Sequence, residues 1–177
     1  MKIEEYAAKC RTFVTMQNAY ALDKYLQLGF IEEVGELSGK FAKIIRAKGK
    51  IVLTTEERFA IAKELGDICW FAAMLTREFN FENLVRYVES RLTIVRSLDK
   101  DRELHIVAIR EMCFSLAKIA SVATTGLTNE MAASCFNYVT MIAGKIGFTL
   151  DEILQMNIDK LTDRQNRGVI NGDGDNR

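Results

Sequence analysis

The stretch GFIEEVGELSGKFAKII, residues 29–45, combines a helical pattern with a high density of acids. Its apolar residues recur every three or four positions, which predicts an amphipathic helix. Glu32, Glu33 and Glu36 fall within two turns of that helix. On a helical wheel Glu33 borders the apolar stripe, and Glu36 lies about 60° further round. Because like charges this close repel one another, the pattern indicates a positively charged partner nearby.

The rest of the chain predicts an all-α fold. It has 177 residues and no proline, and its apolar residues keep the helical spacing of three and four. The length suits a single domain over residues 1–177. We expect a four-helix-bundle core with additional helices, and a polar, Gly-rich, mobile tail over residues 169–177.

The predicted helices follow from apolar periodicity and capping residues. Gly29 is expected to end the first helix, whose core candidates are Tyr6, Phe13, Tyr20 and Leu22. The expected helical ranges are 3–28, 30–46, 56–79, 82–98, 102–124, about 129–145, and a last helix within 147–168. Their expected N-caps include Thr55, Thr128 or Asn129, and Thr149, the last with Glu152 in a capping box.

An internal duplication is a hypothesis for residues 31–84 and 106–154. The segment VGELSGKFAKI, 34–44, aligns with IREMCFSLAKI, 109–119. A second alignment places Met131 and Ser134 opposite Glu64 and Asp67, so the second copy would have lost its acids. The alternative is that helices resemble one another by default.

Composition narrows the class of protein. Lys+Arg and Asp+Glu both number 24, and this zero net charge argues against a nucleic-acid partner. The longest apolar run, ICWFAAML, is too short to cross a membrane, and MKIEEY does not begin a signal peptide. The four cysteines form no C-x-x-C pair, which favours buried free thiols in a reducing cytoplasm.

The helix expected over 56–79 carries the sharper signal. Glu64 lies in the middle of its apolar face, and Asp67 lies at the edge one turn later. An ionised glutamate on a core face is costly unless it is paired or bound to a cation. Placed beside Glu33 and Glu36, these residues would bring four carboxylates into one pocket. Oxygen-only ligands of this kind suit Mg²⁺ or Mn²⁺.

The acids allow two other interpretations. Glu-x-x-Glu is common on solvated helix faces, where Lys40, Lys43 and Lys63 could form ordinary surface ion pairs. A di-iron carboxylate bundle needs two Glu-x-x-His motifs. The single histidine, His105, is in no such motif, and we expect it on a helix surface.

Four segments together resemble a known family: EEVGEL, KELGDICWF, NIDKLTDRQNRG and GDGDNR. The combination is similar to the MazG-like all-α nucleoside triphosphate pyrophosphohydrolases of bacteria and their phages, a superfamily with the dimeric dUTPases and dCTP pyrophosphatases. Its hallmark, E-x-x-E followed by E-x-x-D, falls on Glu33, Glu36, Glu64 and Asp67. The resemblance implies that these four acids bind Mg²⁺, and that Glu33 or Glu36 activates the attacking water.

The resemblance also implies the substrate and its contacts. Members hydrolyse a nucleoside triphosphate between its α and β phosphates, releasing a monophosphate and pyrophosphate. The corresponding Asn157, Lys160 and Arg164 share one helix face and would contact the nucleotide. Alone, this segment reads as a solvated face. In the tail, Asp175 and Arg177 could close over the substrate.

One departure from the family pattern leaves substrate and assembly open. A long segment holding the proposed second copy separates the E-x-x-D helix from the N-x-x-K segment, as in the dimeric dUTPases. A homodimer is therefore one alternative. A second function is also open: a non-catalytic helical scaffold or nucleotide sensor that keeps the fold.

Overall fold

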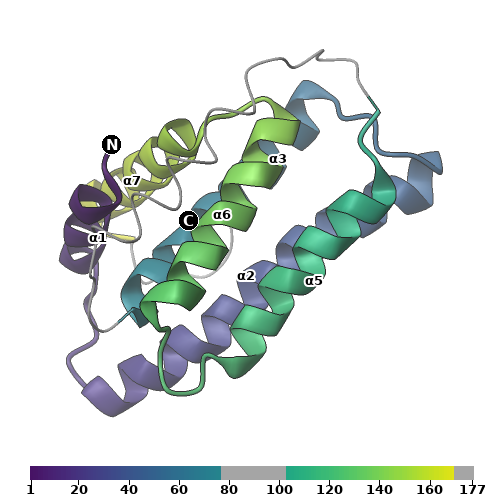
Figure 1. Ribbon diagram of the computed structural model, residues 1–177. Helices are drawn as coiled ribbons and strands as arrows, with labels where there is room; N and C mark the ends of the chain where they lie inside the picture. The colour runs from purple at the N-terminus through teal and green to yellow at the C-terminus, as the bar shows by residue number, and fades with distance from the viewer. Residues whose placement is uncertain (77–102, 170–177) are drawn as a thin grey trace.

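The computed structural model describes residues 1–76 and 103–169, and its helices are labelled as in Figure 1. Within these residues the protein has six helices and no β-strand, which confirms the all-α prediction. The helices are α1 (Ile3–Thr12), α2 (Ala19–Lys48), α3 (Thr55–Leu75), α5 (Ile106–Val122), α6 (Asn129–Ile146) and α7 (Leu150–Asn166).

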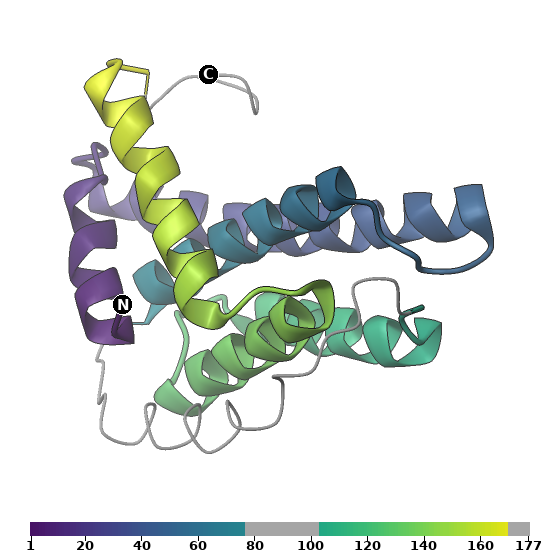
Figure 2. The same ribbon diagram turned by 90° about the horizontal axis from the view of Figure 1, so that it is seen from above.

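The helices α2, α3, α5 and α6 form a four-helix bundle in two layers. One layer is the pair α2 and α3, and the other is the pair α5 and α6, as Figure 2 shows. Each helix contacts its partner in the layer, and α2 also contacts α5 while α3 contacts α6. The helices α1 and α7 pack together across one end of the bundle, against α3. The apolar faces predicted from the spacing therefore meet in one core.

The apolar core runs through all six helices. Its largest fully buried side chains are Tyr6, Phe30, Leu37, Ile51, Ile61, Leu65, Ile68, Ile109, Leu116, Phe136 and Ile142. The loops are tied into this core by isolated bridges. Leu104 N–H donates to the carbonyl of Ile51, and Leu127 N–H donates to that of Leu75.

Three expectations about the first helices are wrong. The predicted helix over 3–28 is broken, because α1 ends at Thr12 and α2 begins after Asn18, whose side chain caps it by accepting from Ala21 N–H at 3.0 Å. Helix α2 then continues through Gly29 to Lys48. Tyr20, proposed for the core, is 75% exposed.

Gly29 has a packing role instead of a terminating one. A Cβ atom at this position would lie 2.3 Å from Cζ of Phe71, which is a severe overlap. The missing side chain therefore lets α2 approach the last turns of α3 closely. The prediction was wrong because a glycine at a helix crossing cannot be distinguished from a glycine at a helix end without knowledge of the neighbouring helix.

Two other helix ends differ from the prediction by about one turn, since α3 ends at Leu75 and not at 79, and α5 begins at Ile106 and not at 102. The N-cap of α3 is Thr54 and not Thr55, and it forms a capping box with Glu57. The predicted box of Thr149 and Glu152 is confirmed at the start of α7. The helix expected over 82–98 lies outside the described residues.

Two further sequence predictions can be compared with the structure. All four cysteines are buried and free, as expected. Among the described helices, none has the length and apolar character needed to span a membrane.

Candidate functional site

Three carboxylates meet where α2 crosses α3. Glu33 comes from α2, and Glu64 and Asp67 come from α3, where their spacing of three places them on one face. One carboxylate oxygen from each residue lies within 4.8 Å of the other two. The pattern of acids at i and i+3 on α3, facing an acid on α2, is thus present in space. Such a set of oxygens fits a hard divalent cation.

The cluster is partly removed from water, and this changes its protonation. Burial, with Asp67 and then Glu64 as the next causes, raises the pKa of Glu33 from 4.5 to about 9. Burial also raises the pKa of Glu64, although Lys40 opposes this shift. Three close carboxyls in a low dielectric cannot all remain ionised without added positive charge. The protein alone supplies that charge only in part.

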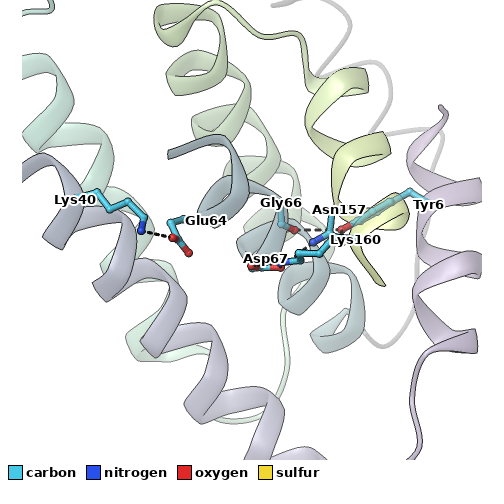
Figure 3. Close-up of polar contacts among 7 residues, drawn as sticks. All are labelled: Tyr6, Lys40, Glu64, Gly66, Asp67, Asn157 and Lys160. Atoms are coloured by element: carbon cyan, nitrogen blue, oxygen red, sulfur yellow. Dashed lines mark hydrogen bonds and ion pairs between the residues drawn. The ribbon is translucent and has the colours of Figure 1, made fainter. Parts of the chain in front are cut away.

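Two lysines from different helices hold two of the three acids (Figure 3). Nζ of Lys40, on α2, lies 2.7 Å from Oε1 of Glu64, a side chain that is only 4% exposed. Nζ of Lys160, on α7, contacts both carboxylate oxygens of Asp67. The interpretation as lysine pairs is therefore partly right, but the pairs are not ordinary surface pairs. No hydrogen bond or ion pair to Glu33 is found among residues 1–76 and 103–169.

A buried polar relay from α1 and α7 fixes the orientation of Asp67. Asn157 is 3% exposed, and its Nδ2 donates to Oδ1 of Asp67 at 2.8 Å. Its Oδ1 accepts from the hydroxyl of Tyr6 at 2.8 Å. The same hydroxyl also lies 3.3 Å from the carbonyl of Gly66. Figure 3 shows the row running from Tyr6 to Asp67.

Gly66 makes this relay possible. A Cβ atom at this position would lie 3.0 Å from Cβ of Asn157 and 3.3 Å from its Nδ2. The glycine therefore allows α7 to lie close enough to α3 for Asn157 to reach Asp67. In the sequence KELGDIC, the glycine directly before Asp67 is thus part of the site geometry.

A pocket of about 350 Å³ opens beside this relay, between α3 and α7. Arg164 lines it and is 6% exposed, and its guanidinium has no hydrogen bond or ion pair within the part of the chain that the structure describes. A buried arginine without a partner is expensive, so the pocket is suited to an anion. The lining also includes Lys63, Asn157, Asp159, Lys160, Asp163 and Arg167.

A second pocket, of about 380 Å³, opens on the other side of Lys63. It is lined by Lys40 and Glu64, by Phe59, and by residues of the first turns of α3. Phe59 is 47% exposed and offers an aromatic surface. The ion pair of Lys40 and Glu64 thus lines one pocket, and Lys160, which pairs with Asp67, lines the other.

The remaining predicted residues are distributed as follows. Glu36 is exposed on α2 and is outside the group of three acids, although its charge contributes to raising the pKa of Glu33 and Glu64. Asp175 and Arg177 lie outside the described residues. Asn157, Lys160 and Arg164 share the first pocket, as their spacing indicated.

Sequence reasoning missed Tyr6 and Gly66 as parts of the site. The sequence predicts Tyr6 only as a core residue, because nothing in α1 marks its hydroxyl as a donor to α7. Gly66 carried a usable signal. A glycine inside a strong helical pattern costs stability, so it often marks a close approach of backbones.

Comparisons with known proteins leave the family open. No family model matches this chain, and no solved structure matches it. The chain is similar to the Gene 37 protein of Mycobacterium phage L5, with 36% identity over 56 residues. The similar segment covers 32% of this chain and 48% of the phage protein, so the chain matches about half of that relative's length.

Proposed function

We propose that this protein is a Mg²⁺-dependent nucleoside triphosphate pyrophosphohydrolase that releases a monophosphate and pyrophosphate. The observation that carries the proposal is the group of Glu33, Glu64 and Asp67, with oxygens within 4.8 Å. Next to it lies a pocket lined by Lys160 and by Arg164, whose guanidinium has no partner among the described residues. Carboxylates for a cation beside basic groups for an anion are what a metal–triphosphate substrate requires. Nucleotide housekeeping in the cytoplasm, by a monomer or a homodimer, would be the setting.

The three acids fit the ion that this chemistry needs. Their donors are all carboxylate oxygens, which suit Mg²⁺, and Mn²⁺ as a substitute. When bound, the ion would supply positive charge that keeps the carboxyls ionised and polarises a phosphate oxygen. Glu36 would join through a rotamer change or through a water, since its charge already acts on Glu33 and Glu64.

The chain's own residues divide the remaining work. Arg164 and Lys160 would bind phosphate oxygens in the pocket between α3 and α7. Asn157 holds Asp67 in place through its amide. Glu33 is the acid of the three without a described partner, so it is the group best placed to accept a proton from the attacking water. This assigns to Glu33 the role that the sequence left between Glu33 and Glu36.

The decisive experiment is pyrophosphate release from a panel of ribo- and deoxyribonucleoside triphosphates, with and without Mg²⁺. We expect at least one member to be cleaved only with the ion. Glu64→Gln should abolish turnover and leave the helical circular dichroism intact. Activity that survives in this variant would contradict the assignment of Glu64. No cleavage of any nucleotide would reject the enzyme.

A second candidate is a non-catalytic scaffold or nucleotide sensor. One observation favours it: Lys40 and Lys160 already pair with Glu64 and Asp67, so two of the three acids are neutralised without a metal. Under this alternative a nucleotide would bind without being cleaved. The same panel, followed by calorimetric binding for each uncleaved nucleotide, separates the two functions.

A further inference from the structure

We infer that Lys40 and Lys160 are resident counterions that a divalent cation must displace, so that each lysine weakens metal binding in the absence of substrate. The inference rests on the proposed metal site of Glu33, Glu64 and Asp67. It adds a form of regulation to that site, in which a divalent cation from solution replaces the two lysine ammonium groups.

The charge balance of the metal-free site supports this exchange. Lys40 neutralises Glu64 at 2.7 Å, and Lys160 neutralises Asp67 through both oxygens. Glu64 is 3% exposed, so water contributes little to its stabilisation. A buried carboxylate of this kind needs a cation from the protein or from solution. The two lysines fill that need before any metal arrives.

The lysines and a metal ion would compete for the same oxygens. Mg²⁺ binds carboxylate oxygens at about 2.1 Å, and Nζ of Lys40 already lies 2.7 Å from Oε1 of Glu64. Two cations sharing one oxygen repel strongly in a low dielectric. The conflict is greatest at Asp67, since Oδ1 also accepts from Asn157 and Lys160 leaves neither oxygen unclaimed. Binding of the ion therefore requires that Lys160 leave.

The structure offers each displaced lysine a place to go. Lys160 also lines the pocket that contains Arg164, and Lys40 also lines the pocket beside Phe59. Arg164 is an independent sign of a ligand there, because it is buried and no described residue pairs with its guanidinium. A released Lys160 would add a second positive charge to the same pocket. The metal would thus prepare the anion site, and the lysines would act against metal alone but in favour of metal with a polyphosphate.

The test measures binding of Mn²⁺ alone to the full chain, from the electron paramagnetic resonance signal of the free ion. We expect Lys160→Met to bind Mn²⁺ on the order of tenfold more tightly than the wild type, with Lys40→Met shifted in the same direction by less. Lys43→Met, on the exposed surface of α2, is the matched control and should leave the affinity within about twofold. Lys160→Arg, which keeps the charge, should stay near the wild type.

A second readout uses the wild-type protein and does not depend on how the variants fold. We expect the ammonium ¹⁵N signals of the two paired lysines to move when Mg²⁺ is added, while the signal of Lys43 stays in place. Equal or weaker Mn²⁺ binding by Lys160→Met, or unmoved lysine signals on Mg²⁺ saturation, would overturn the exchange alone. A wild type that binds no Mn²⁺ would overturn the proposed metal site as well.

Discussion

The two helix pairs of the bundle differ in how they carry polar groups. On α3, Glu64 and Asp67 each face a lysine from another helix. Under the hypothesis of an internal duplication, the residues that align with them on α6 are Met131 and Ser134, which carry no charge. The pair α5 and α6 therefore forms half of the bundle without acids at the positions that align with Glu64 and Asp67.

The buried polar groups of α6 show the same contrast. The hydroxyl of Thr140 donates to the carbonyl of Phe136, one turn earlier on its own helix. Asn137 has a long contact from Nδ2 to the sulfur of Met141, 3.8 Å away, and its Oδ1 is unpartnered in the described part of the chain. The partners found for these two side chains lie on α6 itself, whereas the polar groups of α3 contact residues of three other helices.

The difference follows from what covers each half. Helix α1 contacts α3 and α7, and of the bundle helices α3 makes the more extensive contact with α7. Tyr6, Asn157 and Lys160 all come from these two covering helices. A bundle made of two similar pairs would thus have a single site, because Tyr6, Asn157 and Lys160 all direct their polar groups to α3.

The largest expected effect comes from removing one negative charge from the pair α2 and α3. Asp67→Asn should reduce pyrophosphate release by at least about 100-fold, because it removes a proposed metal ligand and the partner of Lys160. The matched change on the other half, Ser134→Ala, should leave the rate within about twofold. Steady-state rates at saturating Mg²⁺ measure both. A comparable loss in Ser134→Ala would mean that the halves share the chemistry.

The sequence predicts which helix carries the acids, but not the contacts between helices that hold them in place. The positions of Glu64 and Asp67 on an apolar face follow from periodicity, and so does the capping box at Thr149. The break before Asn18 does not, because residues 13–18 contain neither proline nor glycine, and their weak helix propensity was outweighed by the apolar pattern. Asn18, as a good N-cap residue, was the signal available.

Contacts between helices are the part that the sequence leaves open. The pairing of Lys40 with Glu64, rather than with an acid on its own helix, depends on how α2 crosses α3. The role of Tyr6 depends on the meeting of α1 and α7, which are separated by most of the chain. A helical wheel gives the direction of a side chain on one helix but not which helix it faces.

The next effect is a pH dependence of stability that belongs to the acidic half. Glu33 has a pKa of about 9 in the metal-free fold and an ordinary value of 4.5 when unfolded, so the folded state holds an extra proton between these values. The contribution of Glu33 to the free energy of unfolding is therefore expected to be largest below about pH 4.5. It should decline as the pH rises from there toward 9.

Glu33→Gln tests this assignment, because glutamine does not titrate. Urea unfolding at several pH values, without divalent ions, should show a flatter decline in the variant than in the wild type. Saturating Mg²⁺ should also flatten the wild-type curve, since the ion favours the ionised carboxyl. Equal slopes for the two proteins in the absence of metal would reject the buried, protonated state of Glu33.

A smaller effect tests how closely α2 approaches α3. Gly29→Ala should lower the free energy of unfolding by about 1–3 kcal/mol, because the new methyl group overlaps the ring of Phe71. Gly35→Ala, on the same helix, has open space around the added Cβ and should raise it by about 0.5–1 kcal/mol. Thermal unfolding of the two variants therefore gives shifts of opposite sign. Shifts of the same sign would mean that the close crossing is absent.

The smallest effect separates the relay of α1 and α7 from simple packing. Tyr6→Phe keeps the ring in the core but removes the hydroxyl that donates to Oδ1 of Asn157. The amide of Asn157 can then rotate and present its oxygen to Asp67, which weakens the orientation of that acid. We expect kcat to decrease about fivefold to tenfold, in line with the loss of about one hydrogen bond, with KM nearly unchanged.

Tyr138→Phe on α6 is the matched control from the other half, since Tyr138 is partly buried against the same core. It should leave kcat unchanged and shift the melting temperature no more than Tyr6→Phe does. The ¹⁵N chemical shift of the Asn157 amide distinguishes positioning from stability, because only the loss of the Tyr6 hydroxyl should move it. If both variants lower kcat equally, the hydroxyl of Tyr6 contributes packing alone, and the site depends on Asn157 without support from α1.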